Sequence, residues 1–334
     1  MIFGGILLAA LSGVCNGLFT TPMKLESRWK WENIWFGFIL VACVAMPGAI
    51  AGWTSPGWTQ VLARAPRTAV ATALGFGFAW GFGAIAFGLS VDYLGVSIGN
   101  SLVIGLSSAL GSLVPLVLGG TLRFNARIVM LFAGILAFLA GVALCGDAGM
   151  RRDGGASGTA GRPQLKGYIF AVAAGVMSAI FNIGFTLALP IANSGLSMGL
   201  SRFGATNCIW VPMLGAGAVP NIFYCAYLMH KNGTAELMVS APGARGWPFS
   251  AIMGVLWGGS IFLYGAAVPW LGDIGPSIGW PLSLAVGLLV ANLMGLLLGE
   301  WRAAPAVAIS RMRIGLLTLL AAVVLCAASS RING

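Results

Sequence analysis

The chain has 334 residues, of which 58% are apolar and only 8% are charged. Soluble domains carry about 25% charged residues, so this composition excludes a soluble domain and indicates a polytopic membrane protein. The formal net charge is +10, but the basic residues lie between long apolar runs, where they set membrane orientation and give no indication of nucleic-acid binding. The six cysteines are scattered without a CxxC pair, which argues against a zinc site or a disulfide framework, and we expect no cofactor.

Ten apolar runs approach the length of about 20 residues that crosses a bilayer as a helix. The first five spans are expected at residues 2–21, 33–52, 69–90, 96–119 and 126–146. The other five are expected at residues 167–191, 205–229, 247–269, 275–299 and 313–329. The first run has no basic region before it, so we interpret it as a retained span and not as a signal peptide. The expected fold is therefore all-α, with ten transmembrane helices.

Residues 147–166 are the one long hydrophilic stretch, rich in Gly, Arg, Ala and Ser. This composition is typical of a linker, and it separates a first half at residues 1–146 from a second half at residues 167–334. Each half would hold five spans. Because five is odd, the second half enters the membrane from the opposite side, and two similar halves then form an inverted repeat.

Similarity between the halves is clearest in residues 80–120 and 257–300, each of which is predicted to form a helical hairpin of membrane length. The matched positions are Trp80 with Trp257, Gly88 with Gly265, Leu94-Gly95 with Leu271-Gly272, Ser97-Ile98-Gly99 with Ser277-Ile278-Gly279, and Gly119 with Gly299. Asn100 and Trp280 also align, so the two copies differ there. In a membrane protein, internal repeats point first to a transporter.

Lysine and arginine residues predict the orientation. The loops that follow odd-numbered spans hold 12 of the 18. The positive-inside rule places these loops in the cytoplasm and both termini on the opposite side of the membrane. Glycine pairs at GxxxG spacing, Gly13 with Gly17 and Gly77 with Gly81, are typical of helix contact faces in lipid.

Residues for catalysis are sparse. The single histidine, His230, lies at the end of a span, where an interfacial residue is more common than a ligand or a base. There is no P-loop motif, so an ATP-driven pump is not indicated. We predict that the chain is not an enzyme, and that an ion gradient or the substrate's own gradient drives any transport.

Polar groups inside the spans are better clues to function, because they are costly in lipid and usually face a cavity or a partner. They are Asn16, Asn100, Ser178, Asn182, Asn221 and Asn292. A neutral sugar needs hydroxyl and amide partners and aromatic faces. The candidates for substrate binding are Asn16, Trp80, Asn100, Ser178, Trp257, Tyr264 and Trp280. The alternative for each is structural, since asparagine can join helices and tryptophan can anchor a span at the interface.

A proton-coupled carrier usually needs a carboxylate that is alternately buried and wetted. Of the eight acids, Glu32 at the start of a span and Asp273 in a short connection are the candidates for proton coupling. Glu32 could instead pair with Lys24 or Lys30. Structural or gating roles are expected for Lys24, Asn221 and Glu300.

The segment PMKLESRWKWENIW at residues 22–35 resembles the L-rhamnose–proton symporter family, within the drug/metabolite transporter superfamily of ten-helix carriers. The matching residues there are Pro22, Lys24, Trp29, Trp31, Glu32 and Trp35. Later matches are Trp80-Gly81, Gly88-Leu89, Tyr93-Leu94-Gly95, Ser97 with Gly99, Gly217-Ala218 with Asn221, Trp257 with Tyr264, Trp280 and Glu300-Trp301. The resemblance implies a secondary active transporter that takes a deoxyhexose inward with a proton by alternating access. It also implies a location in a bacterial inner membrane, where the predicted orientation puts both termini in the periplasm. It also implies a central cavity built from the first, third, fourth, sixth, eighth and ninth spans.

Two alternatives stay open. One is a facilitator or exporter of another small polar metabolite in the same superfamily. The other is a channel or a membrane-embedded enzyme, and the lack of clustered His, Cys or acidic residues argues against the enzyme. The expected partners are a small-molecule sugar, protons in the symport case, and the lipid bilayer.

Overall fold

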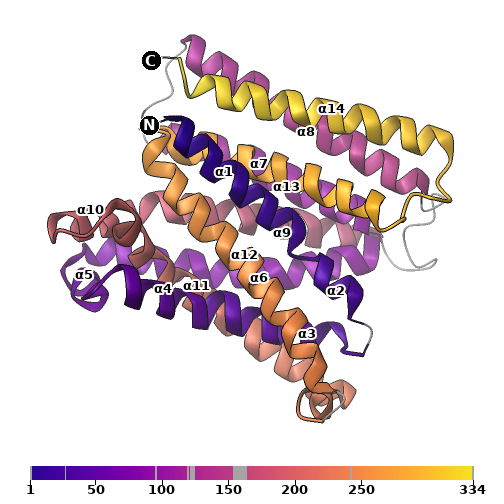
Figure 1. Cartoon of the computed structure of the whole chain (residues 1–334), viewed down its shortest axis with the longest axis horizontal. Coiled ribbons are helices and arrows are strands. Elements are labelled where there is room, and N and C mark those ends of the chain that lie inside the picture. Colours follow the sequence, from indigo (N-terminus) through magenta and orange to yellow (C-terminus); the bar gives the residue numbers. More distant parts are fainter. Residues whose placement is uncertain are drawn as a thin grey trace. The chain divides into compact units, whose positions relative to one another are not determined.

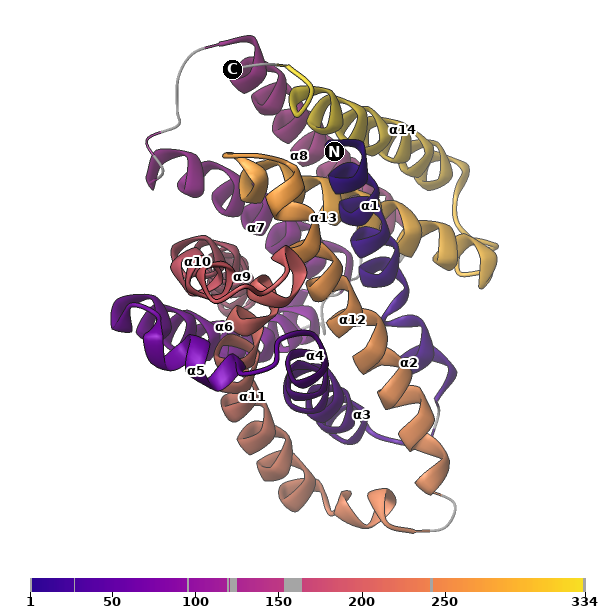
Figure 2. The same ribbon diagram turned by 60° about the vertical axis from the view of Figure 1, so that its left-hand side comes forward.

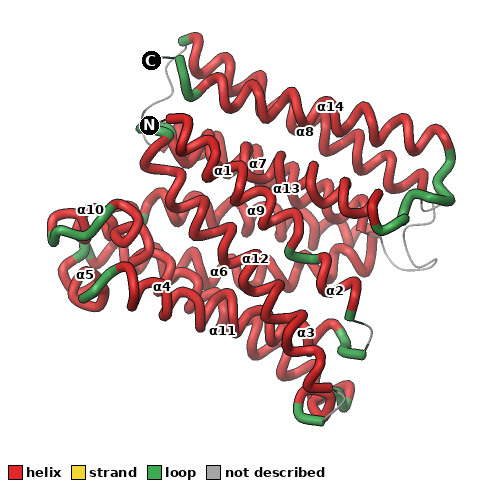
Figure 3. The backbone as a smooth tube through the Cα atoms, in the orientation of Figure 1, coloured by secondary structure: helices red, strands yellow, loops and turns green. Residues whose placement is uncertain are grey.

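The computed structural model of the chain describes residues 2–26, 28–94, 96–118, 120, 125–152, 164–240 and 243–332. The regular structure in these residues is helical, without strands (Figure 3). Ten helical segments are long and apolar enough to cross a membrane. They are Ile2–Met23, Trp31–Thr54, Arg67–Ser90, Ile98–Leu118, Ala126–Arg152, Leu165–Ser197, Arg202–Asn232, Ala244–Trp270, Gly275–Leu297 and Ala306–Ser329. The predicted all-α fold with ten spans is confirmed.

Several spans contain more than one helix, and short helices also lie between spans (Figure 1). In chain order the helices are α1 (Ile2–Leu18), α2 (Thr21–Leu25), α3 (Trp31–Ile39), η1 (Leu40–Ala45), α4 (Met46–Thr54), α5 (Trp58–Arg64), α6 (Arg67–Leu94), α7 (Val96–Leu118), α8 (Ala126–Arg152), α9 (Gln164–Leu187), α10 (Leu189–Ser197), α11 (Arg202–Asn232), η2 (Ala235–Met238), η3 (Gly243–Gly246), α12 (Trp247–Ala267), η4 (Val268–Trp270), α13 (Gly275–Leu297) and α14 (Ala306–Ser329).

Prolines explain where two spans depart from regular α-helix. The π-helical turn η1 directly precedes α4, in which Pro47 is the second residue. The sixth span breaks at Ala188, and Pro190 lies in the first turn of α10. Proline has no amide hydrogen to donate, so the first turn of a helix is where it costs least.

The centre of the chain differs from the sequence prediction. We expected a linker from residue 147, whereas α8 continues to Arg152. Arg151 Nε donates to the carboxylate of Asp147 at 2.9 Å, one helical turn earlier, and such a pair supports a helix. Residues 153–163 of the predicted linker lie outside the described residues, as do Gly95 and Gly119 of the matched hairpins.

The chain forms two compact units. The first comprises Met1–Gly17, Gly83–Ile183 and Ala267–Gly334, and the second comprises Leu18–Phe82 and Gly184–Ala266. Each unit therefore combines segments from both halves of the sequence, and α6 and α9 each contribute to both units. The division into two five-helix repeats stays a prediction about sequence duplication.

In the first unit, α8 and α14 lie side by side (Figures 1 and 2). A Cβ added at Gly134 of α8 would lie 2.7 Å from the sulfur of Cys326, and one at Gly315 of α14 would lie 2.8 Å from the sulfur of Cys145. The contacts run up one helix and down the other, so α8 and α14 are antiparallel. The two contacts are also equivalent under the repeat, because the same offset in numbering relates Gly134 to Gly315 and Cys145 to Cys326.

The first unit holds a second interchanged set, in which α1 packs on η4 and α13 while α9 packs on the end of α6 and on α7. The contacts are Gly5 with Trp270 and Leu271, Gly13 with Ser283 and Val286, Gly167 with Tyr93 and Leu94, and Gly175 with Val103 and Leu106. The same offset in numbering relates Gly5 to Gly167 and Gly13 to Gly175. The residues that these glycines contact also correspond to each other in the alignment of the two hairpins. The first span of each half thus packs on the hairpin of the other half.

The second unit shows the same exchange. Gly77 and Gly81 of α6 face α11 at Met213 and Gly217, and Gly254 and Gly258 of α12 face the second span at Val41, Ala42 and Met46. The offset that relates these two glycine pairs is the one that relates Trp80 to Trp257. Small residues let backbones approach where no hydrophobic force joins helices. The predicted contact face at Gly77 and Gly81 is confirmed.

Candidate functional site

Two tryptophans of the second unit stack on each other. The rings of Trp80 on α6 and Trp257 on α12 have centroids 5.1 Å apart and planes 13° from parallel. Both side chains are half-buried. Gly217 of α11 lies against Trp80, where an added Cβ would come within 2.7 Å of the ring, so a larger residue would displace the pair. The structure therefore brings two predicted substrate-binding residues together.

A row of aromatic side chains leads from α3 to this pair. Trp31 and Trp35 stack with centroids 5.2 Å apart, Trp35 lies 4.8 Å from Phe38, and Phe38 meets Trp257 edge-on at 5.7 Å and 81°. The α3 members are spaced four and three residues apart, so they share one face of the helix. We call Trp31, Trp35, Phe38, Trp257 and Trp80 the aromatic row.

Asn221 joins three helices beside the aromatic row. Trp35 Nε1 donates to Asn221 Oδ1 at 3.1 Å, and Asn221 Nδ2 donates to the carbonyls of Gly81 and Gly217 at 3.1 and 3.0 Å. The residue is 1% exposed. A buried amide with both ends bonded specifies one arrangement of α3, α6 and α11, which supports the structural role predicted for it.

Glu32 is the buried acid among those whose side chains the structure describes. Its Oε1 accepts hydrogen bonds from Asn232 Nδ2 and Thr234 Oγ1, both at 2.9 Å. The next residue, Asn33, donates from Nδ2 to the carbonyl of Thr234 at 2.9 Å. Side chains at the start of α3 therefore hold the end of α11. The described bonds to Glu32 come from neutral groups, and the side chain of Lys24 lies outside the described residues.

Tyr264 belongs to a core cluster of the second unit. It is 1% exposed and packs on Phe185 with centroids 5.6 Å apart, and Phe185 stacks on Trp210 at 4.5 Å and 5°. These contacts favour a packing role for Tyr264 in this conformation. Its role in substrate binding stays a prediction.

In the first unit, Ser178 and Trp280 meet around Ser107. Ser107 Oγ donates to Ser178 Oγ at 2.8 Å, and Trp280 Nε1 donates to the Ser107 carbonyl at 3.2 Å. Asn182 Nδ2 donates to the Gly111 carbonyl at 2.7 Å. An added Cβ on Gly111 would lie 2.8 Å from Trp280 Nε1, so the indole needs glycine beneath it. These bonds tie α7, α9 and α13 together.

Asn16 on α1, next to α13, occupies the position that corresponds to Ser178 on α9, next to α7. It is half-buried on α1, and its Nδ2 would lie 3.4 Å from a Cβ on Gly287 of α13. The numbering offsets that relate the glycine contacts also relate Asn16 to Ser178 and Gly287 to Ser107. Asn100 is half-buried on α7. Six of the seven candidates therefore form repeat-related pairs, Asn16 with Ser178, Asn100 with Trp280, and Trp80 with Trp257.

Sequence reasoning missed the hydroxyl groups that support these residues. Ser12 and Ser283 share a hydrogen bond of 2.8 Å between α1 and α13, and Ser107 bonds as described above. The recurrence of Gly13 as Gly175 was the available signal, because it aligns α1 with α9 and places both near the hairpins.

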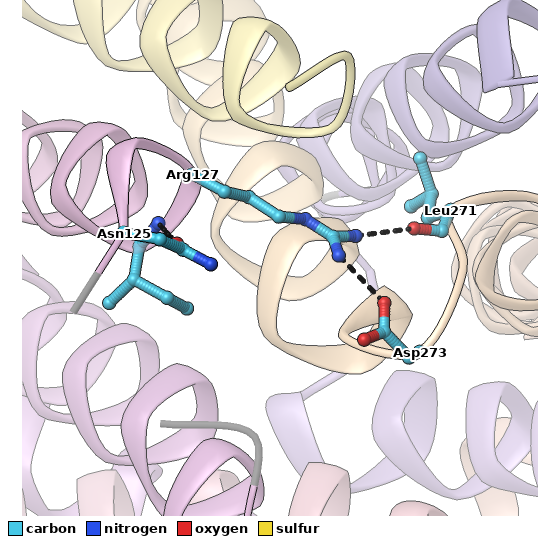
Figure 4. Close-up of polar contacts among 5 residues, drawn as sticks. Asn125, Arg127, Leu271 and Asp273 are labelled. Atoms are coloured by element: carbon cyan, nitrogen blue, oxygen red, sulfur yellow. Dashed lines mark hydrogen bonds and ion pairs between the residues drawn. The ribbon is translucent and has the colours of Figure 1, made fainter. Parts of the chain in front are cut away.

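Asp273, the second proton-coupling candidate, is held by arginine at a helix end (Figure 4). Arg127 Nη1 donates to Asp273 Oδ1 at 2.8 Å, and Nη2 reaches the Leu271 carbonyl at 3.5 Å. Partial burial raises the pKa of Asp273, but the hydrogen bond and the charge of Arg127 outweigh it and hold the pKa below its usual value. The carboxyl therefore stays charged near neutral pH.

Glu300 lies in the loop after α13 and is exposed. Its Oε2 lies 3.4 Å from Arg152 Nη1 at the end of α8, and the Arg152 guanidinium lies 4.9 Å from the centre of the Trp301 ring. This contact fits the structural role predicted for Glu300.

Comparison with known proteins gives one consistent result. A family model described as L-rhamnose-proton symport protein matches residues 1–330. The L-rhamnose-proton symporters of Yersinia pestis (strain Pestoides F) and Yersinia pseudotuberculosis serotype O:3 (strain YPIII) are each 28% identical over 330 residues, covering 95% of this chain and 94% of the relative. The symporter of Yersinia pestis bv. Antiqua (strain Antiqua) is 28% identical over 329 residues, with the same coverage. The similarity extends over both halves and both compact units.

Proposed function

The chain belongs to the L-rhamnose–proton symport protein family, and from that premise we propose that it carries L-rhamnose, or a similar deoxyhexose, across the bacterial inner membrane together with a proton. The family is one of transporters and not of enzymes. The observation that carries the proposal is the match over residues 1–330, because it includes every element that holds a candidate residue. Ten apolar helices supply the multi-pass membrane protein that such transport requires.

We propose alternating access by two inverted repeats as the mechanism. Inverted repeats are related by a pseudo-two-fold axis, so one set of contacts can exchange for its repeat-related set around a fixed substrate site. The antiparallel contact of α8 with α14 supports this mechanism, as do the interchanged glycine contacts within each unit. Small residues at these contacts let the repeat-related helices approach each other closely.

We assign sugar recognition to the repeat-related pairs. Within the second unit, Trp80 and Trp257 offer aromatic faces for the C–H surface of a pyranose ring. Within the first unit, Asn16, Asn100 and Ser178 offer amide and hydroxyl groups at half-buried positions, and we propose each set as a candidate in its own unit. A few polar groups set among apolar walls are typical of a small-molecule site. Trp280 and Tyr264 are more deeply buried, so we assign them to the support of these groups.

Uptake of labelled L-rhamnose into vesicles that contain the purified protein tests the proposal. With an inward proton gradient, the expected result is accumulation above the external concentration, and a protonophore should abolish it. Saturable uptake that is indifferent to the gradient would indicate the facilitator. Counterflow with another sugar or polar metabolite, but not with L-rhamnose, would contradict L-rhamnose as the substrate. It would still show that the protein is a carrier. Vesicles without protein give the background.

A further inference from the structure

We infer that Glu32 is the group that carries the coupled proton, and that its hydrogen bonds to the end of α11 connect that proton to the aromatic row. The inference rests on the proposed function and names a residue for one part of it. A symporter needs a side chain that changes its protonation during the cycle. Glu236, Asp273 and Glu300 are exposed, and the last two face arginines. Glu32 is 5% exposed at the start of a span, where an ionisable residue is costly and usually functional.

The bonds of Glu32 would change when the proton binds. The charged carboxylate accepts the amide of Asn232 and the hydroxyl of Thr234 on one oxygen. A protonated carboxyl group becomes a donor itself and accepts more weakly. Binding of the proton therefore loosens the contact between α3 and the segment that follows α11, while the bond from Asn33 to the Thr234 carbonyl keeps the two segments adjacent.

Few other charges act on this carboxylate. The Lys30 ammonium, just before α3, and the Cys225 thiol of α11 are the titratable groups that interact with it electrostatically. Among the other titratable groups with described side chains on the adjoining segments, Glu26 and Tyr224 are half-buried. The remaining ones, Arg28, Tyr227, His230, Lys231 and Glu236, are exposed. Their interaction with Glu32 is screened by water.

Two paths connect Glu32 to the stacked tryptophans within the second unit. Trp35 lies one turn after Glu32 on α3 and continues through Phe38 to Trp257 in the aromatic row. Trp35 also donates to Asn221, which bonds the carbonyl of Gly81, the residue after Trp80. A change in the position of α3 can therefore reach the rings of both Trp80 and Trp257 through contiguous contacts, which can carry coupling between sites.

The proton balance of the cycle is simple. The carboxylate takes one proton from the side of higher proton activity and holds it as a carboxyl group while the sugar is bound. It releases the proton on the other side, so one positive charge moves with each neutral sugar. Because binding free energies are reciprocal, protonation that favours the sugar-binding arrangement makes the sugar favour protonation by the same factor.

The first test needs no sugar. Infrared difference spectra of the protein, recorded as the pH is stepped downward from about pH 8 through the ordinary glutamate pKa of about 4.3, report the C=O stretch of a carboxyl group that gains a proton. The expected result is a band in the wild type that is absent from Glu32→Gln. An identical band in both proteins, or none in the wild type, would overturn the inference whatever the substrate is.

The second test measures coupling. Glu32→Gln is expected to reduce gradient-driven accumulation of L-rhamnose by more than about tenfold while exchange of internal for external sugar persists. The affinity of the wild type for L-rhamnose should depend on pH, and that of the variant should not. A variant that accumulates the sugar normally would overturn the inference and leave the proposed function intact. A wild type that never transports L-rhamnose would overturn the substrate, and the infrared result would still decide the role of Glu32.

A second substitution covers the case in which Glu32→Gln does not fold. Thr234→Val keeps the shape of the side chain and removes one donor from the carboxylate. The pH of half-maximal uptake should move upward, because the charged form loses a bond. Thr318→Val is the matched control, since Thr318 is exposed on α14 and bonds the carbonyl of Ile314 within its own helix. Equal pH profiles for both variants would contradict the inference.

Discussion

Trp80 and Trp257 occupy matching positions in the two halves of the sequence, and in the structure their rings stack on each other at 5.1 Å. A residue can touch its own counterpart only where the related segments cross, as at a two-fold interface between identical subunits. Substrate sites of repeat-built transporters lie at such places. Their position in the fold, beyond their aromatic character, is therefore the reason to assign the pair to the sugar.

Replacement of Trp257 tests this assignment. Trp257→Ala is expected to raise the KM for L-rhamnose about tenfold, or about 1.4 kcal/mol, because an aromatic face is lost. Trp257→Phe keeps a face and should change KM by less than about threefold. Trp53→Ala is the control, since Trp53 is 86% exposed on α4 and should leave KM unchanged. Equal effects of Ala and Phe at residue 257 in uptake kinetics would rule out stacking on the sugar.

The contact of α8 with α14 gives a prediction about stability. Gly134→Ala and Gly315→Ala should each lower the free energy of unfolding by about 1–3 kcal/mol, because the new methyl groups meet cysteine sulfurs at 2.7 and 2.8 Å. Adding Cys326→Ala to Gly134→Ala should recover part of the loss. Gly75→Ala is the control, since no atom lies within 4 Å of its added Cβ.

Thermal unfolding in detergent measures these effects. The two contacts are related by the repeat, so the two single variants should behave alike. A variant that unfolds at the wild-type temperature, or a large difference between the two positions, would contradict an interchanged contact of equal tightness.

Sequence alone predicted the spans and two of the three repeat-related pairs among the candidates, Trp80 with Trp257 and Asn100 with Trp280. The spans could be predicted because length and hydropathy are set by the bilayer, so the second span was placed at 33–52 and found at Trp31–Thr54. Trp80 and Trp257 could be matched because tryptophan is rare. The match of Gly13 with Gly175 was overlooked because the chain has 50 glycines, and small residues alone do not specify which helix they face.

The partners of polar side chains could not be predicted for a similar reason. A serine in a helix can bond its own helix, as Ser112 does with the Ser108 carbonyl at 2.6 Å, or another helix, as Ser107 does with Ser178. Only packing decides between these states. The sequence suggested Lys24 or Lys30 as a pairing partner for Glu32. Its described hydrogen-bond partners lie about 200 residues away, at Asn232 and Thr234.

Asp273 gives a prediction about pH. The pKa of Asp273 is held below its ordinary value of about 3.9 by Arg127. Its ion pair therefore stabilises the fold above that value and is lost as the pH falls through the lower pKa of the folded state. Asp273→Asn should lower the free energy of unfolding near neutral pH by less than about 1 kcal/mol, because the carboxylate is 63% exposed. The difference from wild type should shrink as the pH falls below that ordinary value.

The same variant separates the two proton-coupling candidates. Because Asp273 stays charged between about pH 5 and pH 8, the shape of the uptake profile over that range should be the same in Asp273→Asn as in the wild type. Uptake rates at matched pH values measure this. A displaced profile would mean that Asp273 takes part in proton coupling.

Membrane orientation is the last prediction. The positive-inside rule places the connection between α8 and α9 in the cytoplasm and both termini in the periplasm. Lys166 at the start of α9 and Arg331 after α14 are both exposed, so Lys166→Cys and Arg331→Cys form a matched pair. A maleimide that cannot cross the inner membrane should label Arg331→Cys in intact cells and Lys166→Cys only after permeabilisation. The reverse labelling pattern would show that the protein has the opposite orientation in the membrane. Orientation also decides the direction of proton release, because Glu32 follows the first connection and would lie at the cytoplasmic end of its span.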